Sequence, residues 1–163
     1  MNNHKELLDG LRQAPLILAE FVQNISSDNL HLRRGEGFWT IAEHLSHLAE
    51  VQLVFIERME RFIHEEHPVF VRFIPDKEKK DASAPVCLSV PQALEQFAAC
   101  RKKQIAILEI IDDATWQKTG THPEYETYSF SFLMRHTLAH DYWHLYRMEA
   151  LWQLKDAYLT GLD

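Results

Sequence analysis

The sequence predicts an all-α protein, a four-helix bundle with an up-down-down-up order and a long crossover between the second and third helices. Apolar residues recur at three- or four-residue steps in four long segments, and strand-like alternation is almost absent. The second and third segments are separated by residues 64–88. A connection of this length can run along the whole bundle, whereas a short loop makes neighbouring helices antiparallel.

The first predicted helix covers residues 3–22, where Pro15 interrupts the apolar face and either kinks the helix or marks a late start. The second begins near Thr40, a plausible N-cap with Glu43 three residues on, and continues to about residue 64. The third begins at Ser89 or Pro91 and extends to about residue 111, since proline is tolerated in a first turn.

The fourth predicted helix covers residues 129–154. A chain of 163 residues is the size of one domain, so a single domain over residues 1–163 is expected. Hydrophobic residues at 46% and charged residues at 25% are typical of globular proteins. Two cysteines are too few for a disulfide framework.

The net charge of −7 disfavours binding to nucleic acid and to anionic membranes. No apolar run approaches the roughly 20 residues of a membrane span, and the first residues lack the pattern of a signal peptide. We therefore expect a cytoplasmic protein without a nucleic-acid or membrane partner.

Three of the ten histidines, His136, His140 and His144, are spaced four residues apart in the last predicted helix. At about 100° per residue, His140 and His144 straddle the centre of the apolar stripe and point inward, with His136 to one side. Neutral imidazole is a good metal ligand, and i, i+4 spacing lets two rings reach one ion. His136 and His144 lie about 12 Å apart along the axis, so a third ligand should come from another helix.

The second predicted helix offers such ligands in the stretch EHLSHLAE. By angle His44 lies nearer the middle of the apolar stripe and His47 near its edge. A site in a groove at the rim of the bundle would need the edge residue, because an open coordination position requires solvent access. The residue pattern permits either histidine. The alternative interpretation is a bundle whose histidines are structural core residues.

Two stretches resemble the DinB-like superfamily. GEGFWTIAEHLSHLAEVQ is similar to its GEWS-x-x-E-x-L-x-H-L segment, and RHTLAHDYWHLYRMEAL is similar to its H-x-x-x-H-D-x-x-H segment. In that family the last histidine of the first motif and two histidines of the second bind a divalent metal. Aligning Trp39 with the tryptophan of the first motif makes His47 the implied ligand, together with His140 and His144. The order of helices agrees with the family's bundle.

The resemblance implies a metal-dependent enzyme that acts on a small molecule, either by hydrolysis or by thiol S-transfer. The alternative is a metal-binding or stress-associated bundle without catalysis. Zinc or nickel is the expected ion, with iron and copper as further options. Members often dimerise, so a homodimer is expected. Where many relatives have a histidine and a glutamine, this chain has Trp143 and Arg147, so the family's substrates cannot be carried over.

Two residues are candidates for a catalytic role. Glu43 could act as a general base one turn below His47, with a capping-box role as the alternative. Arg147 could steer an anionic substrate, with a rim salt bridge as the alternative. Asp141 is predicted to be a surface carboxylate rather than a hydrogen-bond partner of a ligand. His122 falls in a predicted loop and receives no role.

Overall fold

The computed structural model describes residues 4–74 and 87–159. Its elements are, in order, α1 (Lys5–Gln23), α2 (Ser27–His31), α3 (Ile41–His64), α4 (Val90–Leu108), α5 (Asp113–Gln117), β1 (Thr119–His122), β2 (Tyr125–Ser129), α6 (Phe130–Gln153) and a 3-10 turn, η2 (Asp156–Tyr158). The four long helices match the four predicted segments to within a few residues. Pro15 lies inside α1, so it does not mark the start of that helix.

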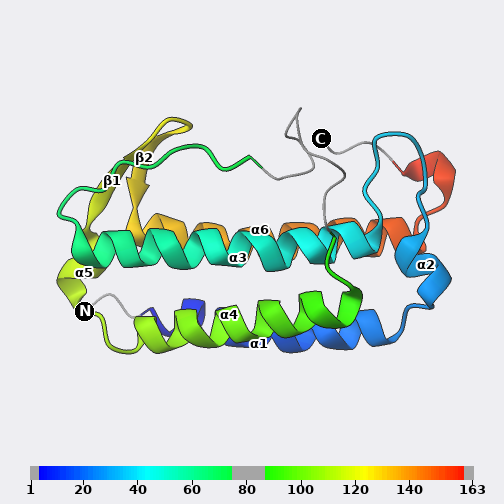
Figure 1. Ribbon diagram of the computed structural model, residues 1–163, viewed down its shortest axis with the longest axis horizontal. Coiled ribbons are helices and arrows are strands. Elements are labelled where there is room, and N and C mark those ends of the chain that lie inside the picture. Colours follow the sequence, from blue (N-terminus) through cyan, green and yellow to red (C-terminus); the bar gives the residue numbers. More distant parts are fainter. Residues whose placement is uncertain (1–3, 75–86, 160–163) are drawn as a thin grey trace.

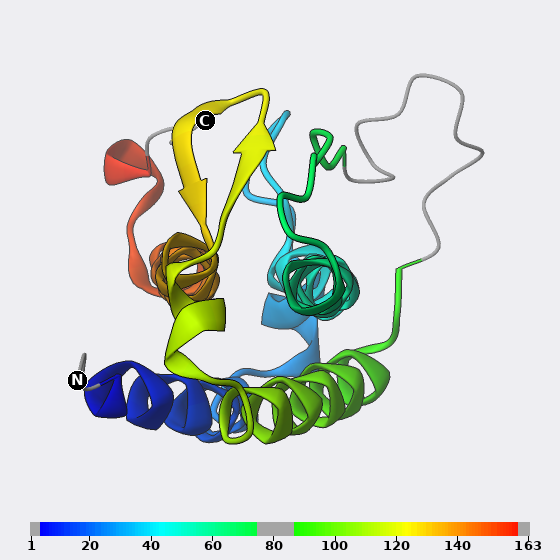
Figure 2. The same cartoon turned by 90° about the vertical axis from the view of Figure 1, so that its left-hand side faces the viewer.

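The long helices form two layers, with α1 and α4 in one and α3 and α6 in the other (Figure 2). Following the chain through Figure 1, α1 and α6 run in one direction and α3 and α4 in the opposite one. The predicted up-down-down-up bundle is therefore confirmed, with α3 and α4 parallel. Part of the predicted crossover lies outside the described residues.

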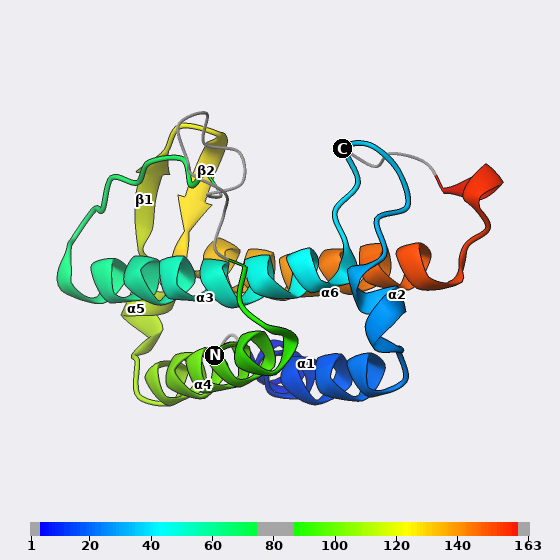
Figure 3. The same ribbon diagram turned by 45° about the vertical axis from the view of Figure 1, so that its right-hand side comes forward.

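A β-hairpin was not predicted. β1 and β2 pair antiparallel, with an irregular register between Gly120 and His122. The strands have four and five residues, too short for alternation to stand out in the sequence. The hairpin and the loops before α3 and after it lie on the outer side of the α3/α6 layer, opposite α1 and α4 (Figures 2 and 3).

The loop after α3 is attached to the edge of this hairpin. The backbone amide of Phe70 donates to the carbonyl of Thr121 (2.8 Å), and the amide of Thr121 donates to the carbonyl of Pro68 (2.9 Å). A Cβ atom at Gly120 would lie 2.6 Å from the Pro68 carbonyl oxygen, so this close approach requires glycine. The contact holds the loop and the hairpin together over one end of α3 and α6.

The apolar core consists of two clusters, one toward each end of the bundle. Within the helices, the positions between the two clusters carry four buried polar side chains, which we call the polar layer: Gln52, Arg101, Gln104 and Asp141. Among the described helices, none is long and apolar enough to span a lipid bilayer.

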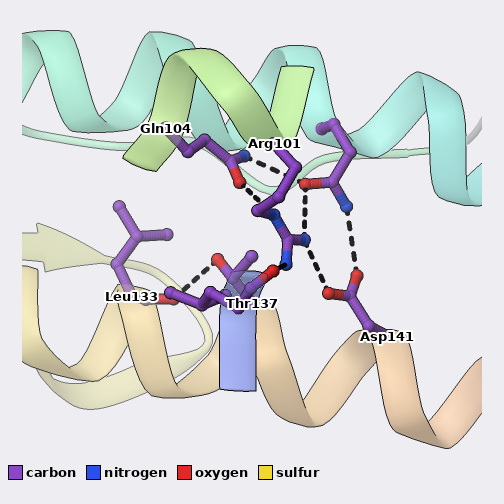
Figure 4. Close-up of polar contacts among 7 residues, drawn as sticks. Arg101, Gln104, Leu133, Thr137 and Asp141 are labelled. Carbon is purple, nitrogen blue, oxygen red and sulfur yellow. Dashed lines mark hydrogen bonds and ion pairs between the residues drawn. The ribbon is translucent and has the colours of Figure 1, made fainter. Parts of the chain in front are cut away.

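The polar layer is closely hydrogen-bonded (Figure 4). Arg101 donates to Asp141 (2.6 Å), to Gln52 (3.1 Å) and to Gln104 (2.7 Å), and it also donates to the carbonyl oxygen of Leu11 (3.0 Å). The Gln52 amide donates to the second oxygen of Asp141 (3.1 Å), and Gln104 donates to Gln52 (3.0 Å). The prediction of a surface carboxylate at Asp141 is wrong, because this side chain is 4% exposed and neutralises a buried arginine.

Candidate metal centre

Helix α6 presents two polar faces. Ser129 caps its first turn by accepting a hydrogen bond from the amide of Phe132 (3.1 Å). From that start, His136, His140 and His144 face the outer side of the α3/α6 layer. Asp141 lies about 100° around the helix from His140 and points toward α4, where it contacts Arg101.

Helix α3 is aligned by the predicted capping box. Thr40 accepts a hydrogen bond from the amide of Glu43 (3.1 Å), and the Glu43 carboxylate accepts one from the amide of Thr40 (2.7 Å). With the start of the helix held in this way, His44 and His47 lie on the side facing α6. Arg58, three turns further on, lies on the same side.

These side chains line a pocket of about 660 Å³ between α3, α6 and the outer loops. Its walls also come from residues 36–39, 72–73, 122 and 124–125. This volume lies within the range typical of small-molecule sites. The lining residues are Glu36, Gly37, Phe38, Trp39, His44, His47, Val51, Val54, Phe55, Arg58, Arg72, Phe73, His122, Glu124, Tyr125, His136, His140, Trp143, His144 and Arg147.

Three histidines of the pocket wall converge. One ring nitrogen each from His47, His140 and His144 lies within 4.8 Å of the other two. The Nε2 atoms of His47 and His140 are 3.3 Å apart. Two nitrogens bound to one tetrahedral ion at 2.0–2.1 Å lie roughly 3.3 Å apart, so this spacing fits a shared metal ion such as zinc.

Burial keeps these rings neutral. It lowers the pKa of His47 to about 4 and that of His140 to about 3. The pKa of His144 is also lowered, first by burial and then by the neighbouring His140 and His47. A metal ligand must offer an unprotonated nitrogen, and neutral imidazoles do so at pH 7 without first releasing a proton.

The ring of His144 is held by a contact with His44. The Nδ1 atoms of His44 and His144 are 2.8 Å apart, so one ring donates to the other. When His144 carries its proton on Nδ1, its Nε2 is left unprotonated and available to a metal. By contrast, the Nδ1 atoms of His47 and His140 are buried and have no hydrogen-bond partner among the described residues.

Two tryptophans flank the cluster. The ring of Trp39 lies 5.1 Å from that of His47 and 6.2 Å from that of His144, measured between centroids. Trp143 packs edge-on against His144 at 4.8 Å. Indole rings at these distances are in contact with the histidines, so their fluorescence would report a bound ion.

The two catalytic candidates lie in different surroundings. Glu43 does not line the pocket; one oxygen accepts from Thr40 and the other pairs with Arg33 (2.7 Å). These contacts account for Glu43 without a catalytic role. Arg147 does line the pocket and is 5% exposed. His136 also lines it, in ring contact with His140 at 6.1 Å.

Sequence reasoning missed two polar residues of the pocket, Arg58 and His122, both buried. Arg58 had a detectable signal, since it lies eleven residues after His47 and therefore on the same side of α3. His122 had no detectable signal in the sequence, because its place in the pocket depends on the short hairpin, which periodicity does not reveal.

Comparisons with known proteins agree with the observed fold. Residues 11–148 match the family model of the DinB superfamily. A solved structure similar to this chain is that of YfiT from Bacillus subtilis, described as a probable metal-dependent hydrolase with an unusual four-helix bundle topology. It superposes with a TM-score of 0.77 at 19% sequence identity, over 93% of this chain and 87% of YfiT. No curated protein sequence matches the chain.

Proposed function

The chain belongs to the DinB superfamily, and from this premise and the geometry of its pocket we propose that it is a divalent-metal-dependent enzyme acting on a small molecule, with hydrolysis as its reaction. His47, His140 and His144 are the proposed metal ligands. The observation that supports this best is the convergence of three neutral imidazole nitrogens on the wall of a pocket of about 660 Å³.

A divalent ion bound by three neutral histidines keeps its charge and supplies Lewis acidity, which activates water or a thiol near neutral pH. The chain supplies the surroundings. His44 orients the ring of His144 through the 2.8 Å contact, and Trp39 and Trp143 limit access of water. Arg147, at the same end of the pocket, can hold an anionic group of a substrate.

The likeness to YfiT supports hydrolysis, because that protein is described as a probable metal-dependent hydrolase. Thiol S-transfer would use the same ligands. Zinc or nickel is the proposed ion, since tetrahedral nitrogen sites suit zinc and imidazole suits nickel, iron and copper as well.

The first experiment is elemental analysis of protein purified without a histidine tag, together with His47→Gln and His140→Gln. The matched control is His136→Gln, which changes a pocket histidine outside the cluster. We expect about one ion per chain in the wild type and the control, and loss of the ion in the two ligand variants. A wild type that stays metal-free after incubation with zinc, nickel, iron and copper would contradict the proposal.

Catalysis is tested next on the metal-loaded protein. Ester and amide substrates are compared with thiol and electrophile pairs, and His140→Gln serves as the metal-free reference. Hydrolysis that requires the ion supports the proposal. Metal binding without turnover in either assay would favour the non-catalytic alternative, in which the ion stabilises the bundle.

Assembly as a homodimer and a cytoplasmic location stay predictions. Helix α6 exposes Tyr142 and Tyr146, which is typical of an interface. Light scattering of the wild type and of Tyr146→Glu would test the dimer, because a buried charge at an interface dissociates it.

A further inference from the structure

The pocket has a second polar end, under the hairpin and away from the three histidines. Arg58 reaches this end from α3 and is 8% exposed. Its guanidinium donates to the hydroxyl of Tyr128 (3.0 Å) and to the carbonyl oxygen of Val71 (2.9 Å). Both acceptors are neutral, so neither balances the charge of the arginine.

No carboxylate pairs with Arg58 within residues 4–74 and 87–159. Glu124, at the rim of the same end, pairs with Arg72 (3.0 Å). By contrast, the buried Arg101 has Asp141 as its counterion. A buried charge without a partner is costly, and an anion in the pocket would remove that cost at Arg58.

His122 adds a hydrogen-bond donor. The backbone amide of Glu124 donates to its Nδ1 (3.2 Å), so Nδ1 is unprotonated and the proton of the neutral ring lies on Nε2. That Nε2 is buried, has no hydrogen-bond partner among the described residues, and belongs to a residue that lines the pocket. Burial, and then the charge of Arg58, lowers the pKa of His122, which keeps the ring neutral.

Tyr128 joins the two groups. The ring of His122 stacks on it at 4.8 Å, and the guanidinium carbon of Arg58 lies 5.8 Å from its centroid. The positive charge and the unpartnered N–H group therefore belong to the same end of the pocket. The contact between the hairpin and the loop at Gly120 holds this end in place.

We propose that Arg58 and His122 form a binding site for a carboxylate of the substrate, so that the substrate is a small carboxylic acid. Its body extends along Phe55, whose ring lies 6.1 Å from His136 and 5.7 Å from His140, toward the three-histidine cluster. The assignment of the cluster as the reacting end rests on the proposed function. The carboxylate site itself does not depend on the metal.

The number of donors favours a carboxylate over a phosphate group. Two of the five N–H groups of Arg58 already donate to protein atoms, which leaves three, and His122 adds a fourth donor. A planar monoanion is satisfied by such a set, whereas a phosphate dianion needs more charge and more donors. Phe73, Val54 and Phe55 give apolar walls for the body of the ligand.

The test is calorimetric titration of the full-length wild type with 4-phenylbutyrate, its neutral isostere 4-phenylbutyramide, and 3-phenylpropylphosphonate. Each is measured with zinc and after zinc removal, because a carboxylate could also bind a metal. We expect the carboxylate to bind at least about tenfold more tightly than the amide in both forms, as hydrogen bonds to charged groups do. The same preference is expected in His140→Gln.

Arg58→Gln should abolish this preference, and His122→Leu should reduce it. Arg72→Gln is the matched control, because it removes another pocket arginine that already has a carboxylate partner. Circular dichroism verifies that the variants are folded. No preference in the metal-free wild type, an equal loss in Arg72→Gln, or tighter binding of the phosphonate would overturn the proposal.

These readouts separate the two proposals. If the wild type binds no metal but prefers the carboxylate, the proposed function fails and the carboxylate site stands. If metal binds and no preference is found, the carboxylate site fails alone. Should Arg58→Gln be unfolded, the comparison of acid and amide in the wild type still decides the result.

Discussion

The two sides of the α3/α6 layer differ in whether their buried polar groups have hydrogen-bond partners. On the side of α1 and α4, Arg101 and Asp141 bind each other and two glutamines. On the outer side, the buried Nδ1 atoms of His47 and His140 and the Nε2 of His122 have no partner among the described residues. Each group includes residues of α6, with Asp141 on one side and His140 on the other.

The difference supports a structural role for the side of α1 and α4 and the proposed functional role for the outer side. Burying a polar group is tolerated when its hydrogen bonds are made and is costly when they are not. The polar layer meets this condition with protein atoms alone. On the outer side, one ring nitrogen in each of three pocket-lining residues has no partner among the described residues, and unpaired buried polar groups of this kind are typical of functional sites.

The largest effect is expected from removing one partner of the buried ion pair between Arg101 and Asp141. Asp141→Ala leaves the Arg101 charge buried and unpaired, and should lower the free energy of unfolding by about 3–5 kcal/mol. The double variant Arg101→Met/Asp141→Leu should recover most of that loss, since it removes both charges. Urea unfolding measures both. The contrasting change on the other side, His140→Ala in metal-free protein, should cost only about 1 kcal/mol, because its Nδ1 has no hydrogen bond to lose and its Nε2 has only the 3.3 Å contact with His47. A loss of similar size for Asp141→Ala and His140→Ala would remove the distinction.

A smaller effect is expected from the single hydrogen bond that supports a proposed ligand. His44→Phe keeps a ring beside Trp39 but removes the contact with His144 Nδ1. Loss of such a supporting contact lowers metal affinity by about 10–100-fold. Competition with a fluorescent zinc chelator measures the affinity, with His136→Gln as the control that should keep it. Unchanged affinity in His44→Phe would show that His44 does not orient the ligand.

The pH dependence of stability follows from the neutral histidines of the metal-free protein. The folded pKa of His140, about 3, lies below the ordinary value of 6.5, so the unfolded chain binds the proton first as the pH falls. Stability is therefore lost between about pH 6.5 and pH 3 through His140, and between about pH 6.5 and pH 4 through His47, by up to about 1.4 kcal/mol per pH unit for each histidine. His140→Gln should reduce this slope by about one proton between pH 6 and 5, measured by urea unfolding at each pH. An unchanged slope would contradict the lowered pKa.

The smallest expected effect concerns the start of α3. Thr40→Ala removes the side-chain cap and should cost about 1 kcal/mol of stability. Because the capping box aligns the first turn that carries His44, zinc affinity should fall slightly as well. Thermal unfolding and the chelator competition measure the two effects. Ser26→Ala, which removes the cap of the short helix α2, is the control and should leave zinc affinity unchanged.

The sequence predicted the helices well and the site in part. Periodicity located the four long helices, because one face of each helix is buried along its length. It pointed His140 and His144 toward the bundle interior, whereas in the structure they line a pocket on the outer side of the α3/α6 layer. It could not choose between His44 and His47. The family resemblance pointed to His47, and the structure brings His47 to the cluster and places His44 beside His144. Whether the three histidines bind a metal stays a prediction.

Other residues could not be predicted from the pattern along the chain. Asp141 seemed to be a surface group because it lies to the side of the apolar stripe, yet α4 covers that side and brings Arg101 to it. His122 was read as a loop residue because two short strands give no periodic signal. In both cases the deciding partner is distant in the chain.

What the sequence determined by itself is local: the four long helices, their caps, their order and the spacing of histidines along α6. These features depend on contacts within a few turns of one helix, which residue spacing records. The tertiary structure alone decided which polar groups are satisfied and which are not. It paired Arg101 with Asp141 and left one ring nitrogen in each of the pocket-lining residues His47, His140 and His122 without a partner among the described residues. Hydrogen bonds and charge pairing depend on distances of about 3 Å between side chains from different elements, and such distances exist only once the helices have packed.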